Sequence, residues 1–318
     1  RMRRYWRWMM LIAAAAGAQA CTDLGDGPQP PSRSYFMGFS ALPPSLDTAL
    51  LIPTLTLAAA HSDAGLMQLS IPWQVLLDDT AAATEVRVVR LPLVQFYRGN
   101  GMKVVVTLDV TDGLNRAAEA PELVALGRSI TDTAVQRLYR EYVAAVDSVL
   151  QPDFISLAAE TNLIRFAAPD SVYDAVVTMA NAAAAERAAA GSTTPLMVSV
   201  QVETAWGLLQ GTGVYEGIAP DRADFPFIGA LGLSSYPYLG GFTEPDSIPL
   251  EYYKRLTRGA RLPLVVLEGG WPSVPDGILA STPAMQSRYI ARHARLLHTA
   301  SAAGWFQITF TDLDTRQS

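Results

Sequence analysis

Two stretches of this sequence end a run of mostly apolar residues with a glutamate. Residues 262–273 read Leu-Pro-Leu-Val-Val-Leu-Glu-Gly-Gly-Trp-Pro-Ser and carry Glu268. Residues 153–162 read Asp-Phe-Ile-Ser-Leu-Ala-Ala-Glu-Thr-Asn and carry Glu160. A charge at the tip of a buried strand is costly unless a site uses it. The two glutamates are therefore candidates for acid–base or nucleophilic chemistry.

The alternation of side chains across a strand predicts how each glutamate is aimed. In the downstream stretch it places Leu264, Val266 and Glu268 on one face of the strand. The other face holds Val265 and Leu267, which we expect to meet a covering helix. In the upstream stretch, small side chains precede the glutamate on its own face, which leaves room beside the carboxylate.

The rest of the chain alternates strand-like and helix-like segments. Strands are predicted at residues 34–40, 66–73, 103–110, 154–159, 196–202, 230–236, 262–267 and 305–311. Helices are predicted at 46–62, 132–150, 171–190, 249–258 and 283–303, with another in 73–86 or 85–98. This order predicts a single (β/α)₈ barrel of the α/β class. A doubly wound open sheet is the alternative, but no Gly-rich nucleotide-binding motif opens any helix.

In a (β/α)₈ barrel the active site lies at the carboxyl ends of the strands. Those positions hold carboxylates and aromatic rings, with no cysteine or histidine: Trp73, Asp109, Asp112, Glu160, Asn162, Glu203, Trp206, Tyr236, Tyr238, Glu268 and Trp271. Aromatic faces stack on the apolar faces of sugar rings, and paired carboxylates act as nucleophile and general acid/base. The set therefore predicts a carbohydrate-binding cleft that hydrolyses glycosidic bonds.

Other roles remain open for several of these residues. Glu203 is a third candidate acid, a subsite residue or a scaffold residue. Asp109 is expected to bind sugar hydroxyls, to pair with an arginine or to cap the following helix. The tryptophans Trp73, Trp206 and Trp271 are either sugar platforms or ordinary core aromatics.

Composition argues against several other classes of protein. The chain has 318 residues, 50% hydrophobic and 17% charged, which is enough for one large core. Its net charge of −6 argues against a nucleic-acid partner, which requires a basic surface. The histidines, His61, His293 and His298, lack the spacing of metal ligands. We therefore expect no metal, nucleotide or flavin cofactor.

Glutamates at the ends of the fourth and seventh strands resemble the clan of retaining (β/α)₈ glycoside hydrolases. Within that clan, Leu-Glu-Gly-Gly-Trp-Pro-Ser at 267–273 is similar to the nucleophile segment of endo-β-1,4-galactanases and endo-β-1,3-glucanases. Ser-Tyr-Pro-Tyr at 235–238 is similar to the sixth-strand segment of the glucanases. The resemblance implies Glu268 as nucleophile, Glu160 as general acid/base and Tyr236 as the group that orients the nucleophile. Retention requires the two carboxyl groups to lie about 5–5.5 Å apart.

One position departs from the clan. Its members carry an asparagine, which binds the sugar 2-hydroxyl, directly before the acid/base glutamate, and this chain has Ala159 there. Asn162, two residues beyond Glu160, is the predicted substitute. The alternative function is a non-catalytic carbohydrate-binding lipoprotein on a decayed barrel. The alanine favours this alternative, whereas the retained glutamates and tyrosine oppose it.

The first residues have the pattern of an export signal. Arginines at positions 1, 3, 4 and 7 precede an apolar run at 9–17, and Ala-Gln-Ala-Cys ends at Cys21. The run is too short to span a membrane, and the pattern resembles a bacterial lipoprotein signal. The resemblance implies a signal peptide at 1–20, lipidation of Cys21, a flexible tether to residue 33 and anchoring in the bacterial cell envelope, on the periplasmic or outer-membrane side. An ordinary signal peptide is the alternative. The barrel is expected over 34–318, with its last helix missing or truncated.

Overall fold

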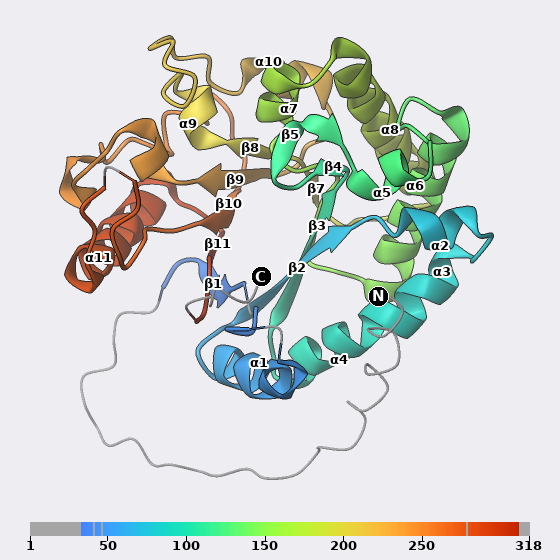
Figure 1. The fold of residues 1–318 in the computed structure, drawn as a ribbon, viewed down its shortest axis with the longest axis horizontal. Coiled ribbons are helices and arrows are strands. Elements are labelled where there is room, and N and C mark those ends of the chain that lie inside the picture. Colours follow the sequence, from blue (N-terminus) through green and yellow to red (C-terminus); the bar gives the residue numbers. More distant parts are fainter. Residues whose placement is uncertain (1–32, 41, 46, 278, 312–318) are drawn as a thin grey trace.

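The computed structural model describes residues 33–40, 42–45, 47–277 and 279–311. Parallel strands form two sheet segments at the centre of the molecule (Figure 1). The first segment runs, in spatial order, β1 (Phe36–Phe39), β11 (Gly304–Gln307), β10 (Leu264–Gly269), β9 (Leu231–Ser235) and β8 (Ser199–Gln201). The second runs β2 (Ala64–Ser70), β3 (Lys103–Asp109), β6 (Phe154–Ser156) and β7 (Leu196–Met197).

The two segments join into a closed ring. At one seam, β7 and β8 are the halves of a single strand interrupted at Val198, and each half pairs with a different neighbour. At the other seam, the Asp63 amide before β2 donates to the Met37 carbonyl of β1 at 2.9 Å. The strands pair in the order in which they occur along the chain, as in a barrel. The predicted (β/α)₈ architecture is therefore confirmed, and the open sheet is excluded.

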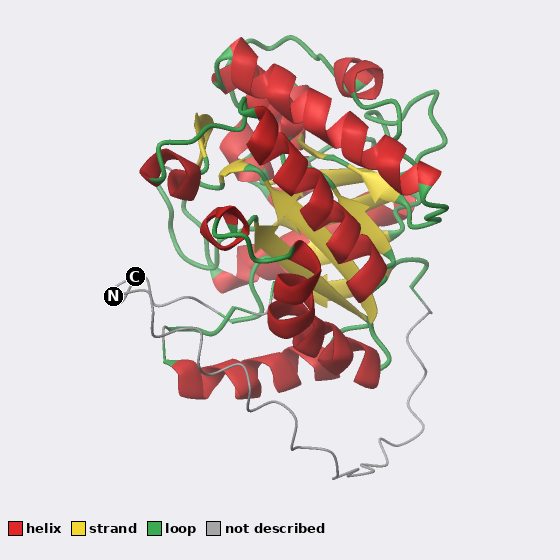
Figure 2. Ribbon diagram, turned by 90° about the vertical axis from the view of Figure 1, so that its right-hand side faces the viewer, coloured by secondary structure: helices red, strands yellow, loops and turns green. Residues whose placement is uncertain are grey.

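Helices surround the strands (Figures 1 and 2). The longer ones are α1 (Leu51–Ala60), α4 (Leu91–Gly99), α6 (Thr133–Ala145), α8 (Asp170–Ala189) and α11 (Pro283–Ala300). Short helices are α2 (Trp73–Leu77), α3 (Ala82–Glu85), α5 (Pro121–Ala125), α7 (Thr161–Ala167), α9 (Val202–Ala205) and α10 (Ala219–Asp224). Single turns of 3₁₀ helix are η3 (Thr48–Leu50), η6 (Pro237–Gly240) and η7 (Pro245–Ser247), and π-helical turns are η4 (Val86–Arg90) and η5 (Val146–Leu150).

Two predicted segments differ from the structure. Of the two alternatives for the second helix, 85–98 is the better one, because α3, η4 and α4 follow one another from Ala82 to Gly99. The predicted helix at 249–258 forms a series of turns instead. Its consecutive residues Tyr252 and Tyr253 are both fully buried, whereas a surface helix buries one stripe of its surface.

Apolar side chains pack on both sides of the ring. The interior cluster collects residues from strands around the whole barrel: Ala64, Leu66, Val105, Met197, Ala230, Val265, Leu267 and Phe306. Two larger clusters pack the outward faces of the strands against the helices. Within the described residues, no helix is both long and apolar enough to cross a membrane. The predicted signal peptide and Cys21 lie outside the described residues, as does most of the tether, of which Arg33 is described. The end of the chain after residue 311, where the last helix is predicted to be missing or truncated, lies outside them too.

Candidate active site

A small cavity lies where the interior of the barrel meets the carboxyl ends of several strands. Its volume is about 30 Å³, and its lining comes from β2, β3, β8, β10 and the connections that follow β3 and β6. The lining residues are Gln68, Thr107, Asp109, Arg116, Ala159, Ser199, Leu267 and Glu268. Both a predicted carboxylate, Glu268, and the residue before the other one, Ala159, therefore face the same space.

Glu268 reaches this cavity because strand β10 contains a bulge. Val266 pairs with Leu233 of β9, but the next pair is Glu268 with Ser234, which leaves Leu267 as an extra residue. An inserted residue bends a strand and re-aims the side chains around it. As a result, Leu267 and Glu268 both line the cavity although they are consecutive.

The predicted alternation along this strand was wrong. Val265 and Leu267 pack in the interior of the barrel, not against a helix. Leu264 and Val266 belong instead to the outer cluster, which includes Leu296 of α11. The prediction assumed that side chains alternate between the two faces along the whole strand. The bulge interrupts this alternation just before Glu268.

The carboxylate of Glu268 has two hydrogen-bond donors. The Tyr236 hydroxyl donates to it at 2.6 Å, and the Gln68 side-chain amide donates at 3.2 Å. Burial and the nearby Glu160 raise the pKa of Glu268, whereas the Tyr236 hydrogen bond and the charge of Arg116 oppose the rise. The two glutamates are thus close enough to interact electrostatically, and Tyr236 stabilises the ionised form of Glu268.

Glu160 is held in an unusual backbone conformation at the start of α7. Its φ of 50° and ψ of 48° lie in the left-handed region, which costs a non-glycine residue about 1–2 kcal/mol. Its amide donates to the Ser199 hydroxyl at 2.9 Å, and its carboxylate accepts from Arg116 Nε at 2.9 Å. Strain of this kind persists only where the surroundings enforce it, and it concentrates at functional sites.

Arg116 is the charged neighbour that the sequence did not reveal. It lies on a hairpin of β4 (Thr111–Asp112) and β5 (Asn115–Glu119), which projects after β3. It is 7% exposed, and its Nη1 donates to Asp109 at 2.6 Å. Of the roles open to Asp109, the structure therefore shows the pairing with an arginine. The only local signal was Asp-Gly at 112–113, a common hairpin turn, which does not say where the arginine points.

Glu203 lies beneath Tyr236, outside the cavity lining. The residue is fully buried, and burial raises the pKa of its carboxyl group. The carboxylate accepts from the Gln201 side-chain amide at 2.6 Å, the Ser235 hydroxyl at 3.1 Å, the Tyr252 hydroxyl at 3.0 Å and the Tyr236 amide at 3.0 Å. The structure thus uses Glu203 as a scaffold for the loop that carries Tyr236. Of its predicted roles, contact with a substrate would require exposure, and the Glu203 side chain is fully buried.

Asn162 does not replace the asparagine that is missing before Glu160. It is 1% exposed, its Nδ2 donates to the Gln201 carbonyl at 2.8 Å, and its Oδ1 accepts from the Gln201 amide at 2.8 Å. Because both ends of its amide bind β8, Asn162 fixes α7 to that strand. Ala159 is the residue of this segment that lines the cavity.

The tryptophans predicted as sugar platforms pack inside the protein. Trp73 and Trp271 are 1% and 3% exposed, and the Trp271 indole donates to the Ser281 hydroxyl at 3.1 Å. Trp206 is partly buried, stacks on Tyr252 and donates to its carbonyl at 3.1 Å. These contacts match the alternative that we left open, that the three rings are structural aromatics.

Tyr238 packs against Tyr236, the residue that donates to Glu268. Its ring meets Tyr236 edge-on, with the ring centroids 6.1 Å apart, and meets Trp271 in the same manner at 5.8 Å. The side chain is partly exposed. Tyr238 therefore both supports Tyr236 and offers aromatic surface beside it.

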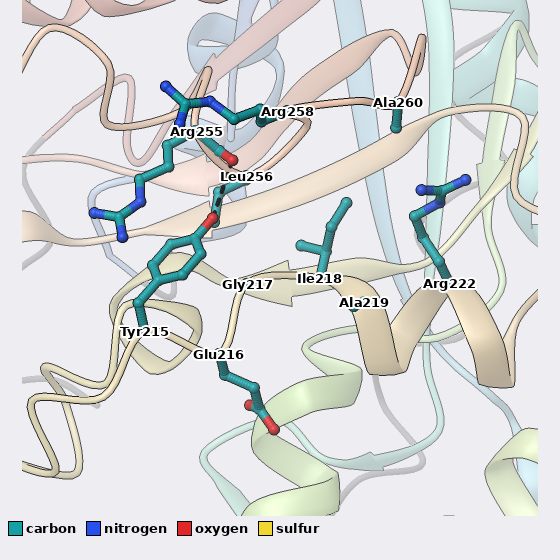
Figure 3. A pocket seen from close by; sticks show the side chains of 10 residues that line it. All are labelled: Tyr215, Glu216, Gly217, Ile218, Ala219, Arg222, Arg255, Leu256, Arg258 and Ala260. Atoms are coloured by element: carbon teal, nitrogen blue, oxygen red, sulfur yellow. Dashed lines mark hydrogen bonds between the residues drawn. The ribbon is translucent and has the colours of Figure 1, made fainter.

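Figure 3 shows a second, larger pocket. It has a volume of about 350 Å³ and is lined by the β8–β9 and β9–β10 connections. In it the Arg255 guanidinium lies 3.9 Å from the centroid of the Tyr215 ring, and the Tyr215 hydroxyl donates to the Arg255 carbonyl. None of the predicted site residues lines this pocket. The described residues contain no cluster of histidine, cysteine or acidic side chains suited to a metal ion.

Comparison with known proteins gives a match in structure alone. No protein-family model and no curated protein matches the sequence. An AHE enzyme from Alicyclobacillus herbarius has a TM-score of 0.56 at 13% identity, over 80% of this chain and 75% of that one. The exo-β-1,4-mannosidase Op5Man5 from Opitutaceae bacterium strain TAV5 has a TM-score of 0.56 at 14% identity, over 87% of this chain and 52% of the mannosidase.

A third similar structure is the GH1 β-glucosidase from Exiguobacterium antarcticum B7. Its TM-score is 0.54 at 13% identity, over 87% of this chain and 86% of the glucosidase. Structural similarity at such low sequence identity indicates a shared fold and does not establish a shared activity. The chain thus has the (β/α)₈ barrel fold that β-glucosidases and a β-mannosidase also have, and it is structurally similar to those glycoside hydrolases.

Proposed function

We propose that this protein hydrolyses β-glycosidic bonds with retention of configuration. The observation that carries the proposal is the pair of Glu160 and Glu268 at one end of the barrel, with Tyr236 donating to Glu268 at 2.6 Å. Glu160 and Tyr236 come after strands β6 and β9, and Glu268 lies near the end of β10, which supports the proposal. The similarity in fold to named β-glucosidases and a β-mannosidase adds support.

In the proposed mechanism Glu268, ionised, attacks the anomeric carbon and forms a glycosyl–enzyme intermediate. Glu160, protonated, donates its proton to the leaving oxygen. A water molecule then attacks the anomeric carbon while Glu160 accepts its proton, which releases the sugar and restores Glu268. Tyr236 keeps Glu268 oriented and stabilises its charge before the attack.

The substrate that we propose is a β-linked galactan or glucan, on the resemblance of residues 267–273 and 235–238 to galactanases and glucanases. We also propose export and lipid attachment at Cys21, which would place the barrel in the cell envelope. No cofactor enters the mechanism.

The alanine at position 159 favours a second function. Ala159 lines the cavity at the position where the clan places its substrate-binding asparagine, and no other described residue of that segment takes its place. A non-catalytic carbohydrate-binding protein is therefore the competing proposal.

Hydrolysis of a panel of β-glucan, β-galactan and β-mannan separates the two functions. We expect residues 34–318 to hydrolyse one of these glycans, and Glu160→Gln to lower kcat about 100- to 10,000-fold. Glu268→Gln should lower it at least as far, because no other residue provides the nucleophile. Glu186→Gln is the matched control, since that side chain is 48% exposed on α8 and pairs only with Arg140.

Each function has a distinct result. Turnover that survives Glu268→Gln would contradict the nucleophile assignment. Binding of one glycan without turnover by the unsubstituted protein would instead support the non-catalytic carbohydrate-binding protein.

A further inference from the structure

Arg116 fills the space between the acidic residues of the candidate site. Its Nε donates to Glu160 at 2.9 Å, and its Nη1 donates to Asp109 at 2.6 Å. The side chain is 6% exposed, so the guanidinium belongs to the interior of the site and not to its rim. It comes from the β4–β5 hairpin, and all other lining residues belong to the barrel strands or to the segment after β6.

The space that remains beside Arg116 is too small for a sugar. The cavity measures about 30 Å³, which is room for about two water molecules. Ligand sites for small molecules usually measure about 300 Å³ or more. A glycosyl unit can therefore enter this cavity only if a lining side chain moves, and Arg116 is the lining residue that comes from the projecting hairpin.

The contact between Arg116 and Glu160 also occupies the carboxyl group that the proposed reaction needs. Arg116 Nε donates to Glu160 Oε2 at 2.9 Å. A general acid must lie within hydrogen-bond reach of the oxygen that it protonates. A leaving glycosidic oxygen can therefore approach this Oε2 atom only once Arg116 has left it.

The contacts of Arg116 allow this movement with most of its partners kept. Besides Glu160, its partners are Asp109, the Thr111 hydroxyl at 3.2 Å and the Asp112 carbonyl at 3.4 Å. These three belong to one continuous stretch at the base of the hairpin, and only Glu160 belongs to another element. A rotation of the guanidinium away from Glu160 therefore gives up one partner and keeps the pairing with Asp109.

We propose that Arg116 is a plug that the substrate displaces, and that its release from Glu160 both opens the sugar site and frees the Glu160 carboxyl group for contact with the leaving oxygen. This inference rests on the proposed glycoside hydrolase function. Arg116 is in this scheme a specificity-determining residue, because only a glycan that displaces it reaches Glu268.

The test compares hydrolysis by the unsubstituted protein with Arg116→Gln, using the glycan that the panel identifies. We expect kcat/KM to rise about tenfold, a change that corresponds to about 1.4 kcal/mol. We also expect the melting temperature to fall, because the substitution leaves the buried Glu160 and the half-buried Asp109 without their partner. Arg128→Gln is the matched control, since Arg128 is 37% exposed and pairs with Asp132 on the surface.

A double variant separates the effect of Arg116 on activity from its effect on stability. Asp109→Asn combined with Arg116→Gln removes one charge of each sign, so the net charge of the cluster stays the same. We expect it to show the same gain in kcat/KM, with a smaller loss in melting temperature.

The results separate the plug from the proposed function. Equal or lower turnover by folded Arg116 variants, with an active unsubstituted protein, would overturn the plug and leave the hydrolase function in place. Absence of turnover in the unsubstituted protein and in both variants would overturn the hydrolase function and the plug with it. Higher turnover with a lower melting temperature supports the plug, because a purely structural arginine would lose both together.

Discussion

At the scale of single residues, Glu203 and Glu268 are both enclosed carboxylates, but their hydrogen bonds give them different chemistry. Glu203 accepts four hydrogen bonds and is fully buried, which leaves it no access to a ligand. Glu268 faces a cavity and keeps two donors, Tyr236 and Gln68. The Tyr236 amide binds Glu203 while its hydroxyl binds Glu268, so the scaffold carboxylate fixes the residue that orients the proposed nucleophile.

Replacing Tyr236 with phenylalanine should shift the acid limb of the pH profile of kcat/KM. The nucleophile is active when ionised, so activity falls as the pH drops through the pKa of Glu268. That pKa is raised by burial and by Glu160, and the hydroxyl of Tyr236 opposes the rise. Removal of the hydroxyl should therefore move the acid limb to still higher pH and lower kcat.

Tyr215→Phe is the matched control for this measurement. Its hydroxyl donates to the Arg255 carbonyl in the separate pocket of Figure 3, so the pH profile should not change. An acid limb that stays in place in Tyr236→Phe would show that another group sets it.

At the scale of elements, β10 is the strand that decides where the proposed nucleophile points. Its bulge at Leu267 turns Glu268 toward the cavity, and Gly269 closes the strand with a φ of 152°. A Cβ at Gly269 would overlap the Ser235 carbonyl oxygen of β9. Gly269, which the sequence presents as part of a turn, is therefore needed for close contact between the two strands.

Gly269→Ala should separate β10 from β9 at the site. We expect a loss of about 1–3 kcal/mol in the free energy of unfolding, as for other overpacked positions, and a fall in kcat from the displaced Glu268. Urea unfolding and hydrolysis rates measure the two effects. Gly99→Ala is the control, because a Cβ there meets no atom and alanine favours the end of α4. A Gly269→Ala protein as stable as the unsubstituted one would contradict the proposed close contact.

At the scale of the whole molecule, we propose that a lipid is attached at Cys21 and that a tether joins it to the barrel, which begins at residue 34. Because Cys21 is the only cysteine in the chain, thioether-linked lipid has one attachment site. Expression of the full chain in a bacterium with a radiolabelled fatty acid should label the protein and place it in the membrane fraction. Cys21→Ala should abolish the label and leave the folded barrel outside that fraction. A label that persists in Cys21→Ala would contradict attachment at this residue.

The sequence by itself determined the order of the barrel strands, the barrel, and the strand ends that carry Glu160, Tyr236 and Glu268. These follow from local patterns: runs of apolar residues, turn residues and the place of each glutamate along its strand. The sequence analysis also included, among its alternatives, the structural role of the tryptophans and the pairing of Asp109 with an arginine.

Only the tertiary structure decided which side chains meet. The bulge in β10, the burial of Glu203 and Asn162 and the insertion of Arg116 between Asp109 and Glu160 depend on contacts between segments far apart in the chain. Arg116 is 44 residues from Glu160, and nothing in the composition of the hairpin distinguishes an arginine that points into the barrel from one in solvent. Packing at the mouth of the barrel made that choice, because the buried Glu160 and the half-buried Asp109 are stabilised there by a counter-charge.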